Sequence, residues 1–191
     1  AQTKPKRCLI LVPSDGIRNQ WIDALGRCGI KGNSAEGTTT DFTGSDGVLI
    51  ATYTTFAANA TLRGVSDLVI FDESQSLKNL VETPSNRALA AYDLVRKQMR
   101  ADKKILYLSA TPYEKPWQAK IYESLGLWEG DFDEWVTTQG VKIETMRVKT
   151  KYGDKDIKQY KLIGNGMQAV KSVLKQHLKS LCKGVFLQRE V

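Results

Sequence analysis

Two apolar runs of this chain each end in polar residues, and these two strand-like runs constrain the fold more than any other feature. Leu68 to Phe71 is followed by Asp72 and Glu73, and Ile105 to Leu108 is followed by Ser109. Short continuous apolar runs are typical of strands buried on both faces of a parallel sheet. Because open α/β sheets bind ligands at the carboxyl ends of their strands, the acid pair and the hydroxyl are expected at one binding edge.

The first 112 residues alternate apolar runs with helical patterns, an order typical of βαβ units and an α/β fold with a mainly parallel sheet. Strands are predicted at 8–12, 47–52, 68–72 and 104–109. Helices are predicted from Ser14 or Asp15 to Cys28, over 54–62, and from about 83 to 100, whereas 31–46 is predicted to be a surface loop. Two sets of side chains are expected to face inward: Ile17, Trp21, Ala24, Leu25 and Cys28 from the first helix, and Leu89, Tyr92, Val95 and Met99 from the third.

The sequence changes character after Pro112. Alternating stretches at 141–152 and 157–163, joined around Gly153 and Asp154, predict a β-hairpin. An amphipathic helix is predicted from Met167 to Cys182, with Lys171, Lys175 and Lys179 on one face, and a strand is predicted at 185–191. We therefore expect an appendage made of a basic hairpin and a helix.

The acid pair at the end of the third predicted strand carries the most specific chemistry. In nucleotide hydrolysis, the first carboxylate would hold Mg²⁺ through ordered water and the second would orient or deprotonate the attacking water. The hydroxyls of Ser109 and Thr111 could bond the carboxylates or sense a phosphate. The structural alternatives are acids that cap a helix and a polar strand end closed by Pro112.

Four motifs occur in the order found in the superfamily-two helicases and translocases. Asp72-Glu-Ser-Gln75 resembles motif II, and Ser109-Ala-Thr111 resembles motif III. The segment from Cys8 to Ser14, with Asn19-Gln20-Trp21, resembles motif Ia. The segment 48–56 resembles the next motif in Swi/Snf-type remodellers, and the stretch after motif III is similar to Strawberry-notch-like helicases.

This resemblance implies a three-layer RecA-like domain of the P-loop NTPase type, truncated over 1–112 and continued over 113–191. It implies ATP and Mg²⁺ as cofactors, and a second RecA-like domain that supplies an arginine finger and is not matched in this chain. Asp72 would bind Mg²⁺, Glu73 would activate water, and three further residues would couple the phosphate state to lobe movement: Gln75, Ser109 and Thr111. The nucleic-acid track would include Pro13, Ser14, Gln20, Thr52 and Tyr53.

The phosphate-binding loop of these motors, Gly-x-x-x-x-Gly-Lys-Ser/Thr, does not occur in the 191 residues. We therefore expect a piece of a longer ATP-dependent helicase or double-strand translocase, or a form shortened at its front, that hydrolyses ATP poorly by itself. The alternative is a catalytically inactive nucleic-acid-binding or scaffold module derived from a helicase lobe. A different P-loop-type hydrolase fits the motif Ia and motif III matches less well.

The net charge of +7 and the pI of about 9.3 favour a polyanionic partner. We expect nucleic acid, with DNA preferred to RNA, although the charge itself does not distinguish the two. Lys171, Lys175 and Lys179 are candidates for contacts with the phosphate backbone, although a solvated surface is the simpler interpretation. Cys8, Cys28 and Cys182 are expected to be reduced, buried thiols of an intracellular protein, nuclear or cytoplasmic, with a viral or phage origin open. No apolar run approaches the roughly 18 residues of a membrane span.

Overall fold

The computed structural model describes residues 6–35, 47–151 and 153–164, together with positions 168, 171, 172 and 175. The chain divides into two compact units, and each is described by itself. One unit comprises Ala1–Leu77 and Ser85–Ala110, and the other comprises Lys78–Pro84 and Thr111–Val191. Apart from the four single positions, the predicted helix at 167–182 lies outside the described residues, as does the predicted strand at 185–191.

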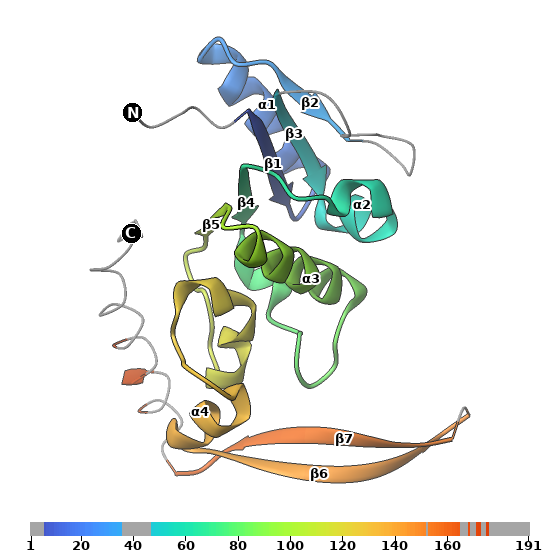
Figure 1. Cartoon of the computed structure of the whole chain (residues 1–191), viewed down its shortest axis with the longest axis vertical. Helices are drawn as coiled ribbons and strands as arrows, with labels where there is room; N and C mark the ends of the chain where they lie inside the picture. The colour runs from blue at the N-terminus through green and yellow to red at the C-terminus, as the bar shows by residue number, and fades with distance from the viewer. Residues whose placement is uncertain are drawn as a thin grey trace. The chain divides into compact units, whose positions relative to one another are not determined.

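The first unit contains a five-stranded parallel sheet in the order β2-β3-β1-β4-β5 (Figure 1). Its strands are β1 (Arg7–Val12), β2 (Gly32–Ser34), β3 (Gly47–Thr52), β4 (Leu68–Asp72) and β5 (Lys104–Leu108). The parallel α/β fold predicted from the sequence is confirmed, and four of these strands lie where they were predicted. The short edge strand β2 was missed because its sequence, Gly-Asn-Ser, has neither apolar character nor β propensity.

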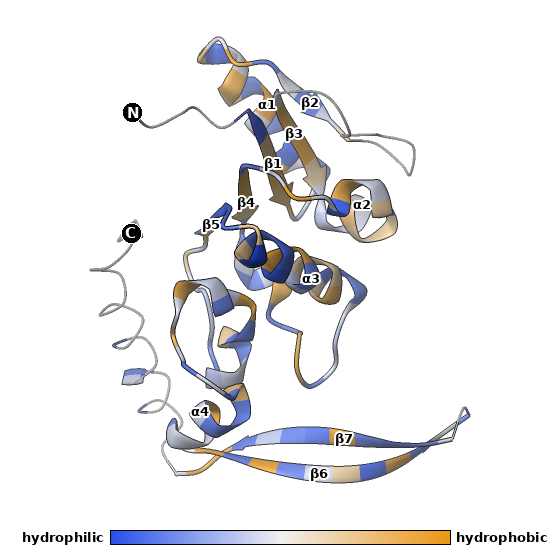
Figure 2. Cartoon of the chain, viewed as in Figure 1, coloured by the Kyte–Doolittle hydropathy of each residue, from blue (hydrophilic) through white to orange (hydrophobic). Residues whose placement is uncertain are grey.

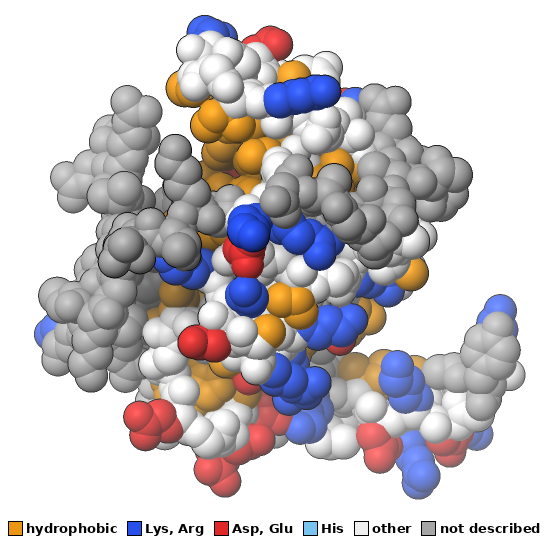
Figure 3. Space-filling model, turned by 45° about the horizontal axis from the view of Figure 1, so that its top comes forward, with side chains coloured by type: hydrophobic (Ala, Val, Ile, Leu, Met, Phe, Trp, Pro, Cys, Tyr) orange, Lys and Arg blue, Asp and Glu red, His pale blue; other side chains and the backbone are white. Residues whose placement is uncertain are grey.

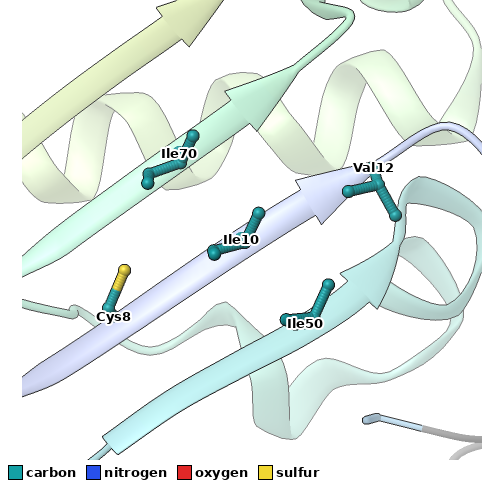
Figure 4. Close-up of a cluster of buried hydrophobic side chains, with 5 residues drawn as sticks. All are labelled: Cys8, Ile10, Val12, Ile50 and Ile70. Atoms are coloured by element: carbon teal, nitrogen blue, oxygen red, sulfur yellow. The ribbon is translucent and has the colours of Figure 1, made fainter. Parts of the chain in front are cut away.

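Helix α1 (Asp15–Arg27) covers one face of the sheet, and Ser14 caps it by accepting a hydrogen bond from the Ile17 amide. The sheet face beneath it is apolar, and Figure 4 shows its buried members side by side on neighbouring strands: Cys8, Ile10, Val12, Ile50 and Ile70. Side chains of α1 pack against them, namely Ile17, Trp21, Ile22 and Leu25. Figure 2 shows the hydrophobic colouring of these central strands.

Helices α2 (Tyr53–Ala58) and α3 (Asn86–Arg100) lie on the other face of the sheet (Figure 1). The 3-10 turn η1 (Ala60–Arg63) contacts α2, and the turn η2 (Ser74–Leu77) contacts α3. The predicted inward face of α3 is wrong for Leu89 and Met99, which are 48% and 42% exposed. Val95 is buried as predicted, and the rest of the buried face consists of Ala88, Ala90, Ala91, Leu94 and Gln98. Small alanines let the helix approach the sheet, and the Gln98 amide satisfies buried backbone groups that a Met side chain could not.

The thiols do not share one environment, contrary to the prediction that all of them are buried. Cys8 is buried in the sheet face under α1, and this burial raises the pKa of its thiol to about 11. Cys28 follows the last turn of α1 and is exposed, because the helix ends one residue before the predicted inward position. Cys182 lies outside the described residues.

The second unit is built around a small aromatic core. It contains the 3-10 segment η3 (Pro116–Leu125), helix α4 (Phe132–Thr138) and an antiparallel hairpin of β6 (Val141–Thr150) and β7 (Gly153–Leu162). The predicted hairpin is therefore present. Its base packs into a cluster formed by Trp117, Phe132, Val136, Val141 and Tyr160.

An acidic side chain joins α4 to the hairpin. Asp133 of α4 accepts hydrogen bonds from the Tyr160 hydroxyl, at 2.8 Å, and from the Lys158 ammonium group. Burial acts to raise the pKa of Asp133, but the hydrogen bonds from Lys158 and Tyr160 outweigh it and the pKa is lowered. Towards its tip the hairpin is mostly exposed, with polar and apolar residues mixed along both strands (Figure 2).

None of the helices in the described part of the chain combines the length and the apolar character needed to cross a bilayer.

The corrected packing face of α3 can be tested at Gln98. This fully buried side chain accepts from the Ser66 amide and donates to the Ser66 carbonyl, both at 2.9 Å. Gln98→Leu leaves both backbone groups buried without partners, so we expect urea unfolding to show a loss of about 2–4 kcal/mol. As the control, Leu89→Gln on the exposed face should change stability by less than about 0.5 kcal/mol. Equal effects of the two substitutions would contradict this packing.

The amino-terminal edge of the sheet is held by Asp67, whose carboxylate accepts from Lys103 and from the amides of Lys6 and Arg7. The hydrogen bond from Lys103 is the main reason that the pKa of Asp67 falls to about 2 from its ordinary 3.8. A lowered native pKa stabilises the fold above pH 3.8, and this contribution is lost as the pH falls towards 2. Asp67→Asn should therefore flatten the pH dependence of the unfolding free energy in that window, whereas Asp23→Asn, at an exposed position of α1, should not.

Candidate active site

The acid pair lies where the winding of the sheet reverses. After β1 the chain passes to β2 and β3 on one side of it, and after β4 the chain passes to β5 on the other side. Strands β1 and β4 are neighbours, so the crevice between their carboxyl ends is the place where α/β sheets bind ligands. Asp72 is the last residue of β4, and Glu73 follows it.

Both carboxylate oxygens of Asp72 are held by donors. The Trp21 indole Nε1 of α1 donates to Oδ2 at 2.7 Å, and the Glu73 amide donates to Oδ1 at 3.0 Å. A carboxylate has about four acceptor sites, so each oxygen keeps a lone pair for a further ligand. The side chain is half-buried, and the two donors fix the plane of the carboxylate.

Glu73 has an unusual backbone conformation, with φ at +50°. The left-handed region is unfavourable for residues other than glycine, and such residues are enriched at functional sites. The preceding carbonyl, that of Asp72, accepts a 2.8 Å hydrogen bond from the Tyr53 hydroxyl. Tyr53 is 1% exposed and starts α2, so this bond anchors the peptide at which the chain turns.

A hydrogen-bonded chain runs from the second carboxylate to the neighbouring strand. Gln75 Nε2 donates to Glu73 Oε2, and the Ser109 hydroxyl donates to Gln75 Oε1 at 2.5 Å. Ser109 directly follows β5, so Gln75 bridges the ends of β4 and β5. Among the described residues, no hydrogen-bond partner contacts Glu73 Oε1. That oxygen is therefore available to accept a proton from a bound water.

The structure brings together four of the five predicted catalytic residues: Asp72, Glu73, Gln75 and Ser109. Ser109 reaches the acid pair through Gln75, whereas a direct bond between hydroxyl and carboxylate was also compatible with the sequence. Thr111 is exposed and belongs to the second unit.

The predicted nucleic-acid residues fall into two groups by exposure. Ser14 and Gln20 are exposed and Pro13 is half-buried, whereas Thr52 and Tyr53 are 7% and 1% exposed. The Thr52 side chain caps α2, accepting from the Thr55 amide at 3.1 Å. The buried side chains of Thr52 and Tyr53 are thus engaged within the protein and do not face solvent.

The candidate lysines lie near the end of the chain. Lys171 and Lys175 are exposed, and Lys179 lies outside the described residues. Figure 3 shows Lys and Arg side chains in several clusters on one face of the molecule, with Asp and Glu side chains among them.

The donor set at the acid pair suits Mg²⁺. This ion prefers oxygen ligands, keeps several waters, and is usually bound through one or two carboxylates together with substrate phosphates. Asp72 has an oriented carboxylate, and Glu73 lies beside it with one oxygen to which no residue in the described part of the chain donates a hydrogen bond. When bound, Mg²⁺ would neutralise charge on a phosphate and position water.

The links from Trp21 and Tyr53 to Asp72 were not predicted from the sequence. Trp21 was predicted to face inward, and an inward indole N–H needs an acceptor. The Asp72 carboxylate, at the end of the predicted strand 68–72, needed a donor. The sequence therefore did contain a signal for the hydrogen bond between Trp21 and Asp72. No comparable signal connects Tyr53 to a main-chain carbonyl, because a backbone acceptor leaves no mark in the sequence.

The parallel sheet, with an acid pair at its switch point, has the architecture of a RecA-like α/β domain. The chain resembles the solved structure of the Sulfolobus solfataricus SWI2/SNF2 ATPase core in complex with dsDNA, at 16% identity and a TM-score of 0.51. The match covers 69% of this chain and 28% of that one, so the chain spans just over a quarter of the length of that ATPase core.

The family model described as "Type III restriction enzyme, res subunit" (ResIII) matches residues 1–114, more than half of the chain. The chain therefore belongs to the ResIII family, and the predicted membership of the superfamily-two helicases is confirmed. A search of curated proteins finds no match.

Proposed function

We propose that this chain is part of a nucleic-acid-dependent ATPase, a helicase or a double-strand translocase. One observation carries the proposal: the acid pair lies at the switch point of a parallel sheet and is hydrogen-bonded through Gln75 to the next strand end. Membership of a helicase family supports the same chemistry. The related SWI2/SNF2 ATPase core, which was solved with dsDNA, supports duplex DNA as the partner.

In the proposed reaction, Asp72 would hold the Mg²⁺ that accompanies ATP, because its two protein donors leave lone pairs on the carboxylate. Glu73 would accept at Oε1 the proton of the water that attacks the terminal phosphate, and ADP would leave as the phosphate bond breaks, while Gln75 holds the other carboxylate oxygen in place. Because Gln75 also accepts from Ser109, a displacement of the β5 end would turn the Gln75 amide and the Glu73 carboxylate with it. This connection would couple the phosphate state to lobe movement.

The proposed nucleic-acid track uses exposed Ser14, which caps α1, and exposed Gln20 in the second turn of α1, together with Pro13, which precedes Ser14 in the sequence. Contacts of this kind run to phosphate and sugar, so they are independent of base sequence and weaken with salt. The net charge of +7 agrees with a polyanionic partner.

A scaffold that binds nucleic acid without hydrolysis is the second candidate, because the 191 residues contain no Gly-x-x-x-x-Gly-Lys motif. The coding sequence upstream of Ala1 distinguishes the two functions. A Gly-Lys-Thr loop within several tens of residues supports the motor, and a start codon at this point supports the scaffold.

The role of Glu73 is tested in the full-length protein that contains this chain. Glu73→Gln keeps the shape of the side chain and removes its basicity, so ATP should bind with unchanged affinity while turnover falls at least about 100-fold. ATP binding and phosphate release are measured on the same preparation. Glu123→Gln, in η3, serves as the control and should leave turnover unchanged. Near-normal hydrolysis by Glu73→Gln would contradict the proposed base.

The role of the basic segment is tested by salt dependence. Replacing Lys171, Lys175 and Lys179 with Gln should reduce the slope of log K against log salt for duplex DNA by about one for each phosphate that is no longer neutralised. Lys97→Gln and Lys103→Gln remove charge from side chains that form ion pairs in the first unit and serve as controls. An unchanged slope in the triple variant would assign the three lysines to a solvated surface.

A further inference from the structure

Two side chains outside the acid pair reach Asp72 from different helices. The Trp21 indole extends from α1 to the Asp72 carboxylate, and the Tyr53 hydroxyl extends from the first residue of α2 to the Asp72 carbonyl. These bonds, at 2.7 and 2.8 Å, connect residues 51 and 19 positions apart in the chain. The acid pair is thus tied to a helix on each face of the sheet.

The Trp21 bond fixes the side chain of Asp72. An N–H donor to an ionised carboxylate forms a charge-assisted hydrogen bond, which is stronger than a bond between neutral groups. With the Glu73 amide on Oδ1 and the indole on Oδ2, rotation of the carboxylate would break both bonds. The indole nitrogen can only donate a hydrogen bond, so Trp21 always presents a donor to the Asp72 carboxylate.

The Tyr53 bond fixes the main chain between the two acids. It holds the carbonyl of the peptide that joins Asp72 to Glu73, directly before the residue with φ of +50°. Because Tyr53 is buried, its hydroxyl meets little competition from water. The unfavourable conformation of Glu73 is therefore held by an anchor outside its own strand.

We propose that Trp21 and Tyr53 are positioning residues that set the geometry of the Asp72–Glu73 pair, an inference whose catalytic meaning rests on the proposed ATPase function. The two helices begin at the caps Ser14 and Thr52. A displacement of either helix would move one donor and so reorient Asp72 or the Asp72–Glu73 peptide. The acid pair therefore responds to the positions of α1 and α2.

Two conservative substitutions separate this role from packing. Trp21→Phe keeps an aromatic ring against the sheet and removes the N–H, and Tyr53→Phe removes only the hydroxyl. The matched controls lie in the second unit. Tyr122→Phe removes a buried hydroxyl that donates to the Pro112 carbonyl at 3.0 Å, and Trp135→Phe alters an aromatic cluster.

Amide hydrogen exchange of the 191-residue chain, followed by NMR, is the primary readout because it needs neither metal nor nucleotide. Both test variants should speed exchange of the Glu73 amide by about ten-fold, the effect of losing one hydrogen bond, while the Ile50 amide in the sheet centre stays unchanged. The two controls should leave both amides unchanged. The proposal would be overturned if the Glu73 amide exchanged at the wild-type rate in both test variants. It would also be overturned if exchange became equally faster at amides throughout the sheet.

Titration with Mg²⁺ alone then tests the proposed function separately. In the wild-type chain Mg²⁺ should shift the Trp21 indole signal, which is assigned by its loss in Trp21→Phe, and Asp72→Asn should abolish the shift. Mg²⁺ binding should weaken about ten-fold in Tyr53→Phe. If Mg²⁺ leaves the Trp21 indole signal of the wild-type chain unchanged, the result would count against the ATPase site. The positioning role is decided by the hydrogen-exchange rate of the Glu73 amide alone.

Discussion

The carboxylate of Asp72 is the point on which the rest of the site depends. It ends a strand that is buried on both faces, and donors from α1 and from the next residue hold its two oxygens. Its carbonyl is held from α2, which leaves Glu73 in the left-handed region. Two helices therefore converge on the last residue of β4, at the place where the sheet reverses its winding. A rigid sheet supplies the platform, and the polar groups at its edge supply the chemistry.

The sheet was predictable because its central strands are buried on both faces, and burial of that kind leaves continuous apolar runs in the sequence. The exceptions have physical causes. Strand β2 lies at the edge with a Gly-Asn-Ser sequence, so pairing with β3 defines it and side-chain character does not. The predicted packing face of α3 was wrong at Leu89 and Met99, because Gln98 is held inward by hydrogen bonds to the buried backbone of Ser66. Hydrophobic periodicity does not predict the burial of a polar side chain that is held inside by hydrogen bonds.

The candidate site was predictable as a set of residue types and less so as a network. Strand ends at 72 and 108 were enough to bring Asp72, Glu73 and Ser109 to one edge, because β4 and β5 are parallel neighbours. The bridging position of Gln75 required the local 3-10 turn that follows Glu73. Tyr53 was assigned to the nucleic-acid track by resemblance, yet its side chain is buried against the acid pair. Tyr53, a residue of the motif assigned to nucleic acid, thus contacts the acid pair of motif II. The order of the motifs along the sequence does not reveal such a contact.

The central claim is that this edge of the sheet belongs to a motor that hydrolyses ATP on nucleic acid. ATP hydrolysis by the full-length protein, measured with Mg²⁺ in the presence and absence of duplex DNA, tests it most directly. We predict hydrolysis that duplex DNA stimulates and that rising salt suppresses along with DNA binding. Hydrolysis that is absent under both conditions, in a preparation that binds the same DNA, would contradict the claim and favour the scaffold.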